Sequence, residues 1–297
     1  MQRAKYQIFN TLSLKIIVLV TMTLDHIGAF LQHYSSSLDP NVVFAGDIFR
    51  IFGRIAFPLV ALLFAEAMRH THDKEHYMSR LGLMTVMVLA FEIGIYYGAN
   101  TSLMDTGNIF ITLLCSASFI YFYESKGAKQ FLALIPFAVI ILSFISDIYL
   151  RAGIEPFYPS YLKAQFSLYG FILCIGFYFA YHFSDQRVMN LTGRNDLASL
   201  RSEPYYRSFT NILWIALLTL VTIIFWLISY IDVKADMYNN AVQSYAMLAV
   251  IPIFLYNGEK GYQKKIIQYG CYLYYPLHLL ILFLAFYLSM GLPHIGW

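Results

Sequence analysis

Two arginines stand four residues apart in an apolar segment, FRIFGRIAFP, where no charge is expected. On a helix Arg50 and Arg54 share one face with Asp47, which comes three residues before Arg50. A charged group inside a membrane-spanning helix costs at least about 2.5 kcal/mol on insertion scales, so such groups mark functional sites by default. Asp47 can neutralise one arginine and hold two helices together, but the second arginine then needs an anionic partner or ligand.

A second polar group comes one apolar segment earlier, in LDHIGAF. Asp25 and His26 are consecutive, so on a helix their side chains point about 100° apart and face different neighbours. We expect Asp25 to pair with Arg50 or Arg54 of the following helix. Histidine is the side chain best suited to exchange a proton near neutral pH, so His26 is a candidate general base. A structural hydrogen bond to a neighbouring helix is the alternative role for His26.

A third candidate lies near the C-terminus, in YLYYPLHLLIL. Pro276 removes the helical hydrogen bond to the carbonyl of Tyr272 and is expected to kink the helix. His278 follows just after this kink. It either donates to the freed carbonyl of Tyr272 or lines the same polar chamber as His26.

The end of the second apolar segment carries Glu66, Arg69 and His70 at spacings of three and four, which is typical of a paired helix end at a membrane surface. His72 and His76 are four residues apart, but no third ligand has a matching spacing, so no metal site is predicted. The sequence contains no phosphate-binding glycine loop and no nucleophile elbow.

These charged residues stand out because charge is scarce in this chain. Only 12% of its 297 residues are charged and 59% are hydrophobic, whereas a soluble domain has about 25% charged residues. This composition excludes a soluble enzyme and a disordered chain. Three cysteines are too few for a disulfide scaffold. The net charge of +3 is too small to indicate a nucleic-acid partner.

Apolar segments with few charges predict nine transmembrane helices. They fall at about 12–33, 48–68, 81–98, 108–124, 131–148, 164–183, 211–231, 240–256 and 266–288. The runs are continuously apolar, which favours helices over an outer-membrane barrel. We therefore expect an all-α polytopic bundle that forms one domain over residues 1–297, with a cytoplasmic loop at about 184–210.

The basic residues predict how this bundle is oriented, because Lys and Arg of short loops stay on the cytoplasmic side. Nine spans place 15 of the 20 basic residues on the side of the N-terminus and three on the other side. The N-terminus is therefore expected in the cytoplasm and the C-terminus outside, in a chain embedded in the lipid bilayer of the bacterial plasma membrane. In this topology the polar cluster lies in the outer half of the membrane and opens outward.

Several ordered motifs resemble the TraX family of membrane proteins. They are LKIIVLVTMTLDHIGAF, FRIFGRIAFPLVALLFAEAMRHT, GNIFITLL, and YNGEKG followed by YLYYPLHLLIL, so the resemblance runs from residue 14 to about 282. The family is named for an F-pilus acetylase that N-acetylates pilin, and it is similar to the acyltransferase-3 group of membrane enzymes that modify extracytoplasmic glycans. Its motif positions fall here on Asp25, His26, Arg50, Arg54, Glu66, His70, Asn108 and His278.

The resemblance implies acyl transfer from acetyl-CoA or another acyl-CoA to an amine or hydroxyl of a glycan, lipid or peptide. The expected catalytic residues are His26, Asp25, Arg50, Arg54 and His278. In this scheme His26 is the general base, Asp25 orients an arginine, and the arginines hold donor phosphates or stabilise the oxyanion. The residues expected to bind the donor are Arg50, Arg54, Arg69, His70 and Asn108. Ala67 stands where the family commonly has glycine, which leaves the acceptor open.

Two other functions remain open from the sequence. Charged groups inside a membrane also mark the pathway of a transporter for a small anion or a proton-coupled substrate. The chain has no repeated halves and no paired broken helices of the kind common in transporters. A non-catalytic partner in pilus or envelope assembly would explain the helices but not the two arginines in one span.

Overall fold

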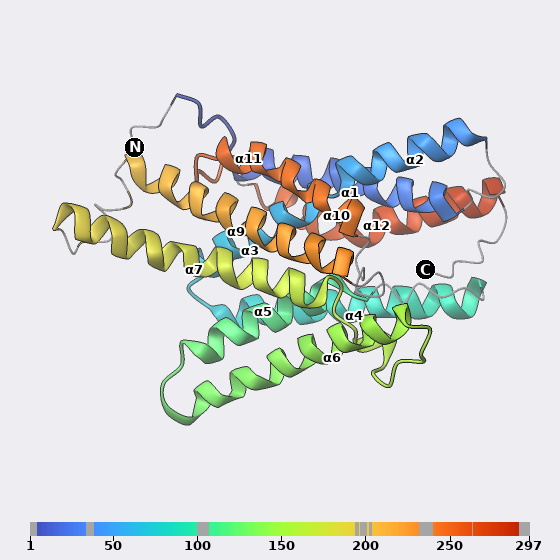
Figure 1. Cartoon of the computed structure of the whole chain (residues 1–297), viewed down its shortest axis with the longest axis horizontal. Helices are drawn as coiled ribbons and strands as arrows, with labels where there is room; N and C mark the ends of the chain where they lie inside the picture. The colour runs from blue at the N-terminus through green and yellow to red at the C-terminus, as the bar shows by residue number, and fades with distance from the viewer. Residues whose placement is uncertain are drawn as a thin grey trace.

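The computed structural model describes residues 5–33, 39–99, 107–193, 204–231, 240–262 and 264–290, together with Asp196 and Arg201. The regular structure in these ranges is helical apart from two isolated bridges, and most of the helices run roughly along the long axis of the molecule (Figure 1). The predicted all-α class is confirmed. Three of the basic residues used for the orientation (Arg3, Arg194 and Lys234) and the C-terminal end of the chain lie outside the described residues.

The helices follow the predicted apolar segments along the chain. They are α1 (Thr11–His33), α2 (Pro40–Gly53), α3 (Ala56–His70), α4 (Lys74–Ala99), α5 (Ile109–Tyr123), α6 (Leu134–Arg151), α7 (Ser167–Thr192), α9 (Pro204–Ile231), α10 (Asn240–Gln243), α11 (Val250–Phe254) and α12 (Lys265–Met290). Short 3₁₀ turns precede α6 (Gly127–Ala133), precede α7 (Ser160–Leu162) and join α10 to α11 (Ser244–Ala249). With α2 joined to α3 and α10 to α11, the helices of the described ranges form nine segments.

Six of the described segments are long and apolar enough to cross a membrane, judged by length and composition. They are Thr11–Gln32, Pro40–His70, Lys74–Ile95, Gly127–Arg151, Ser167–Thr192 and Tyr205–Ile231. Three further apolar segments are shorter: Ile109–Tyr123, Ala241–Phe254 and Leu273–Ser289. The structure thus gives multiple candidate spans at the predicted places.

Several helices extend further than the apolar segments predict. Helix α2 starts at Pro40, eight residues before the predicted span, because the side chain of Asp39 caps it by accepting from the N–H of Asn41. Helix α7 continues to Thr192, where Gly193 ends it in a left-handed conformation, and α9 begins at Pro204. Most of the residues assigned to the loop at 184–210 are therefore helical, because hydropathy marks only the apolar part of a helix.

The second span bends where α2 meets α3. Pro58 has no N–H to donate to the carbonyl of Arg54. At the bend, the N–H of Arg54 donates to the carbonyls of Arg50 and Ile51, and the N–H of Ile55 donates to that of Phe52 at 3.3 Å. Such shortened hydrogen-bond spacing is typical of a local 3₁₀ turn. Arg54 thus lies at the break between α2 and α3.

The core of the bundle lies between α3, α7 and α9. Tyr169, Phe177 and Tyr181 of α7 are at most 1% exposed and pack in one cluster with the fully buried Trp214 of α9. The indole N–H of Trp214 donates to the carbonyl of Phe177 at 2.9 Å, which satisfies its polar group inside the core. Helix α1 packs against this core through α3 and also contacts α2 and α12.

Candidate functional site

One carboxylate joins Arg50, in the last turn of α2, and Arg54, the residue that follows this helix. Asp25 of α1 accepts from Nη1 of Arg50 through Oδ2 and from Nη2 of Arg54 through Oδ1, each at 2.8 Å. The carboxamide of Gln243, at the end of α10, accepts from Nη1 of Arg54 at 3.2 Å. The expected pairing of Asp25 with the following helix is thus found, with both arginines and not with one.

Glycines allow α1 and α2 to approach closely enough for this arrangement. A Cβ atom added to Gly28 would lie 2.6 Å from the carbonyl oxygen of Gly46, and one added to Gly53 would lie 2.3 Å from the Cβ of Asp25. No larger residue fits at either contact without moving a helix. The glycines therefore place the carboxylate of Asp25 beside the guanidinium groups.

The charges in this cluster do not balance. Asp47, which the sequence places on the same helical face, accepts from Gln32 at 2.6 Å and does not pair with the arginines. Asp25 alone neutralises one of the two positive charges of Arg50 and Arg54. Nε of Arg54 is buried and has no hydrogen-bond partner among the described residues. The cluster therefore retains a positive charge and a free donor, which suit an anionic group.

The two histidines of α1 and α12 form a hydrogen-bonded pair. Nε2 of His278 lies 2.9 Å from Nδ1 of His26, and Nδ1 of His278 lies 2.8 Å from the carbonyl oxygen of Tyr274. The sequence left open a contact between His278 and the carbonyl of Tyr272. The ring instead folds back onto the carbonyl of Tyr274, four residues before His278. His278 instead contacts the histidine with which it was expected to share a chamber.

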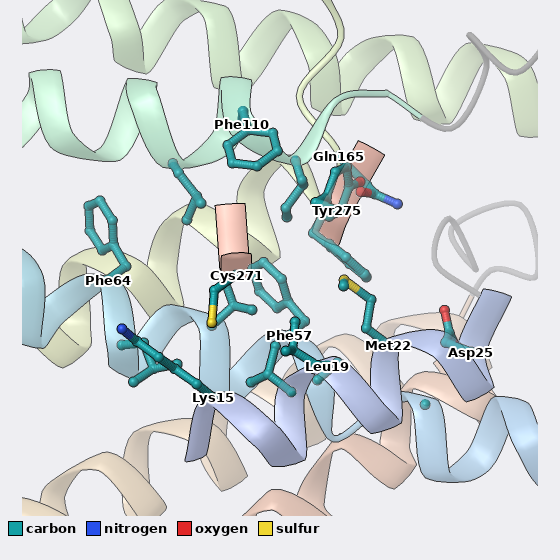
Figure 2. A pocket seen from close by; sticks show the side chains of 18 of the residues that line it. Lys15, Leu19, Met22, Asp25, Phe57, Phe64, Phe110, Gln165, Cys271 and Tyr275 are labelled. Carbon is teal, nitrogen blue, oxygen red and sulfur yellow. The ribbon is translucent and has the colours of Figure 1, made fainter. Parts of the chain in front are cut away.

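A cavity of about 290 Å³ lies beside both clusters, and α1, α3, α4, α5 and α12 supply most of its wall. Figure 2 shows Lys15 and Asp25 on opposite sides of it, with Phe57, Leu19 and Met22 between them. The ten residues from Lys15 to Asp25 correspond to about 15 Å along the axis of α1. The cavity is thus an elongated, mainly apolar passage with a lysine at one end and the carboxylate at the other.

The polar end of this cavity contains part of the predicted catalytic set. Asp25, His26 and Arg54 line it, together with Gln165 and Gln243. Among the described residues, Arg50 and His278 do not line the cavity. Each is hydrogen-bonded to a residue that does, Arg50 to Asp25 and His278 to His26. The structure therefore brings all five predicted catalytic residues together, with three facing the cavity and two behind them.

Asn108, which we expected to bind the donor, has a structural role instead. It is 2% exposed and caps α5, where its Oδ1 accepts from the N–H of Phe110 at 2.9 Å. Its Nδ2 donates to the carbonyl of Thr85 at 3.1 Å, and its backbone pairs with Lys163. This side chain holds α4 and α5 together and does not line the cavity.

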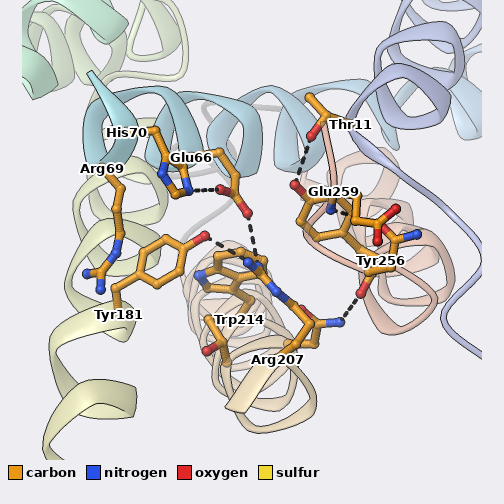
Figure 3. Close-up of polar contacts among 12 residues, drawn as sticks. Thr11, Glu66, Arg69, His70, Tyr181, Arg207, Trp214, Tyr256 and Glu259 are labelled. Carbon is orange, nitrogen blue, oxygen red and sulfur yellow. Dashed lines mark hydrogen bonds and ion pairs between the residues drawn. The ribbon is translucent and has the colours of Figure 1, made fainter. Parts of the chain in front are cut away.

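Arg69 and His70 lie in a second polar cluster, separate from the cavity lining (Figure 3). Nη2 of Arg69 donates to Asp185 at 2.6 Å, and its guanidinium lies 4.2 Å from the ring centre of Tyr181. His70 pairs with Glu66 at 3.1 Å. Half of the His70 side chain is exposed, whereas the Arg69 side chain is 8% exposed.

The centre of the second cluster is an ion pair that the sequence did not predict. Nη1 of Arg207 in α9 donates to Oε1 of Glu66 in α3 at 3.0 Å, and these side chains are 10% and 8% exposed. The guanidinium also lies 5.6 Å from the ring centre of Trp214 and 5.2 Å from that of Tyr256. Arg207 was counted among the basic loop residues, but it is a buried helical residue that joins α3 to α9.

Two further cavity residues were missed. Lys15 was counted only among the 15 basic residues on the side of the N-terminus, although it shares a helical face with residues 18, 22, 25 and 26. This spacing of three and four was the signal that connects Lys15 to the polar pair. Gln243 lies in a segment that the sequence identified only as apolar, so nothing connected it to Arg54.

Among the described residues, no group of three or more His, Cys, Asp or Glu side chains is arranged to hold a metal ion. A family model described as "TraX protein" matches residues 11–192, which span α1 to α7 and include Asp25, His26, Arg50 and Arg54. No curated protein and no solved structure matches the chain.

Proposed function

The chain belongs to the TraX family, and on this premise we propose that it is an integral membrane acyltransferase. It transfers acetyl from cytoplasmic acetyl-CoA, or another acyl group from its CoA ester, to an amine or hydroxyl of a membrane or extracytoplasmic acceptor. Its place is the bacterial plasma membrane. The family is associated with F-pilin acetylation. For this chain we propose only the chemical class of the acceptor, an amine or hydroxyl of a glycan, lipid or peptide.

The cavity is the observation that carries this proposal. It connects Lys15, at the end of α1 that we expect to face the cytoplasm, to a polar end with His26 and Arg54. The apolar wall suits the acyl and pantetheine parts of the donor, whereas its phosphates would be costly to bury there. Lys15 is therefore the residue we assign to the phosphate-bearing end of the donor, in place of the more distant Arg69 and His70.

The polar end provides the groups that acyl transfer needs. His26 accepts the proton of the acceptor hydroxyl or amine, whose lone pair then forms a bond to the thioester carbon. The carbonyl electrons move to oxygen, and this oxyanion lies beside Arg54, whose buried Nε has no partner among the described residues. When the oxyanion collapses, the C–S bond breaks, and the leaving sulfur takes its electron pair and the proton held by His26. The products are the acylated acceptor and CoA.

Arg50 and Asp25 have supporting roles in this scheme. Asp25 holds the end of the Arg54 guanidinium at 2.8 Å, so Nε keeps a fixed orientation. Arg50 binds the other oxygen of the same carboxylate and prevents it from rotating. Arg54 then acts on the oxyanion, whereas Arg50 acts only through Asp25. Neither is assigned to the donor phosphates, because both guanidinium ends are already bound to Asp25.

The proposal is tested with membrane vesicles whose cytoplasmic face is outward, prepared from cells expressing the chain. [¹⁴C]Acetyl-CoA is added, and both free CoA and radioactivity in membrane lipid, glycan and protein fractions are measured. We expect label transfer that is lost in Arg54→Ala and retained in Arg151→Ala, because Arg151 is an exposed residue at the end of α6. Flux of an ion or small anion without acyl transfer would show that the chain is a transporter. If neither flux nor acyl transfer is found, the chain is a non-catalytic assembly partner.

A further inference from the structure

The hydrogen bonds of His278 determine which of its ring nitrogens carries a proton. Its Nδ1 lies 2.8 Å from the carbonyl oxygen of Tyr274. A carbonyl oxygen can only accept a hydrogen bond, so Nδ1 must be the protonated nitrogen. In a neutral imidazole the other nitrogen, Nε2, then has no proton and can only accept.

The tautomer of His278 determines that of His26, because the two rings share a hydrogen bond. Nε2 of His278 lies 2.9 Å from Nδ1 of His26. Because Nε2 of His278 accepts, Nδ1 of His26 must donate. A neutral His26 therefore carries its proton on Nδ1, and its Nε2 holds an unprotonated lone pair.

The lone pair of His26 lies at the polar end of the cavity. His26 is half-buried and lines the cavity. Its Nε2 makes no hydrogen bond to any residue that the structure describes, since the side chain of His26 is hydrogen-bonded only through Nδ1 there. The nitrogen that can accept a proton is thus the one left free for a substrate.

Contacts around His278 keep this ring in place. Its ring is stacked on that of Tyr274, with centres 5.0 Å apart and planes 9° apart. The hydroxyl of Tyr274 forms a hydrogen bond of 2.5 Å with Thr23 of α1, two residues before Asp25. Tyr275, which also lines the cavity, meets the His278 ring edge-on at 5.7 Å. The ring is therefore fixed relative to both α12 and α1.

We infer that His26 is the general base through Nε2, and that His278 is a positioning residue that sets the tautomer of His26. This inference rests on the proposed function and goes beyond it by assigning one nitrogen and one direction of proton transfer. During transfer Nε2 takes the acceptor proton and later returns it to the leaving sulfur, while the Nδ1 proton stays shared with His278. The hydrogen bond to His278 strengthens while His26 is positively charged.

The first test reads the tautomer directly. Protein labelled with [¹⁵N]histidine is purified in detergent, and the His26 signals are assigned by their loss in His26→Ala. Protonated and unprotonated ring nitrogens have well-separated ¹⁵N shifts. We expect a protonated Nδ1 and an unprotonated Nε2 for His26, and the reverse pattern would overturn the inference. This readout does not depend on activity, so it stands apart from failure of the proposed function.

The second test uses variants of His278. His278→Leu removes the acceptor, so we expect a mixed His26 tautomer and an acyl transfer rate lower by at least about 10²-fold, the lower range for a general base. His278→Gln can place an amide oxygen near Nδ1 of His26, so it should restore the tautomer and most of the rate. His72→Gln, at an exposed residue, is the control. If His278→Leu is folded, keeps the wild-type tautomer and transfers normally, His278 has no positioning role.

Two outcomes separate the inference from the proposed function. Absence of acyl transfer in the wild type would contradict the proposed function, whatever the tautomer of His26. Wild-type transfer with a protonated Nε2 on His26 would leave the function in place and contradict only the inference. If His278→Leu does not fold, the ¹⁵N measurement on the wild type and the His278→Gln rate still decide the matter.

Discussion

Gly53 of α2 lies directly against Asp25 of α1, so that a Cβ atom at residue 53 would be 2.3 Å from the Cβ of Asp25 and 2.4 Å from its Oδ1. The carboxylate therefore occupies the space that a side chain at residue 53 would need. Because Arg50 and Arg54 flank Gly53 in sequence, this contact places one carboxylate oxygen at each guanidinium. The distance between two helices thus determines the charge geometry of the site.

Replacing Gly53 by alanine tests this relationship. The added methyl group must push α1 away from α2, and overpacking of this kind costs about 1–3 kcal/mol. We expect Gly53→Ala to lower the thermal unfolding temperature in detergent and to reduce acyl transfer. Gly82→Ala is the matched control, because a Cβ atom at Gly82 of α4 would meet no atom within 4 Å. Equal stability and activity of both variants would show that the close contact is not needed.

The buried ion pair of Glu66 and Arg207 predicts that substitutions at these two residues have coupled effects on stability. Removing one partner leaves an uncompensated buried charge, which costs about 3–5 kcal/mol. We expect Glu66→Gln and Arg207→Met each to reduce the amount of folded protein in the membrane and its unfolding temperature. The double variant should be less destabilised than the sum of the single variants. Additive effects would contradict a direct pair between α3 and α9.

Glu124, just after α5, predicts a pH dependence of stability. Burial alone would raise the pKa of Glu124, but hydrogen bonds from Lys74 and Tyr178 and the nearby His182 outweigh it and lower the pKa from 4.5 to about 2. A lowered pKa stabilises the folded chain above the ordinary value, and this stabilisation is lost as the pH falls toward 2. The unfolding temperature of wild type should exceed that of Glu124→Gln above pH 5, and the difference should shrink on acidification. A difference that grew at low pH would contradict the lowered pKa.

Cys271 provides a probe of donor binding, because it lines the cavity whereas Cys115 and Cys174 are buried elsewhere. We expect N-ethylmaleimide to label wild-type protein mainly at Cys271 and Cys271→Ser much more slowly. Acetyl-CoA should slow the labelling of Cys271, because it fills the same cavity. The nucleotide part alone, added as 3′-phospho-ADP, should protect less, since it lacks the part that enters the apolar passage. Labelling that acetyl-CoA does not change would place the donor outside this cavity.

The sequence predicted the helices well because hydrophobic segments of this length have few alternatives in a membrane. It also predicted that Asp25 would pair with the helix of Arg50 and Arg54, since a buried carboxylate needs a cation. It did not predict the ends of α7 and α9. Polar helix ends look like loop sequence, and only the structure shows that residues such as Arg207 remain helical and buried.

Contacts between distant segments account for what the sequence could not predict about the site. Asn108 was expected to bind the donor, but its side chain caps α5 at Phe110 and donates to the carbonyl of Thr85 in α4. The sequence does not show this second contact, which lies 23 residues away along the chain. Gln243 reaches Arg54 from a segment 189 residues away. The hydrogen bond between His26 and His278 spans 252 residues, so its direction could only follow from the atoms in contact.

The most direct test of the central claim compares wild type with His26→Ala in membrane vesicles supplied with [¹⁴C]acetyl-CoA, at equal amounts of protein in the membrane. We expect wild type to release CoA and to transfer label to a membrane acceptor. His26→Ala should lose both, while acetyl-CoA still protects its Cys271 from N-ethylmaleimide. Full transfer by His26→Ala would remove this residue from the reaction and contradict the proposed mechanism.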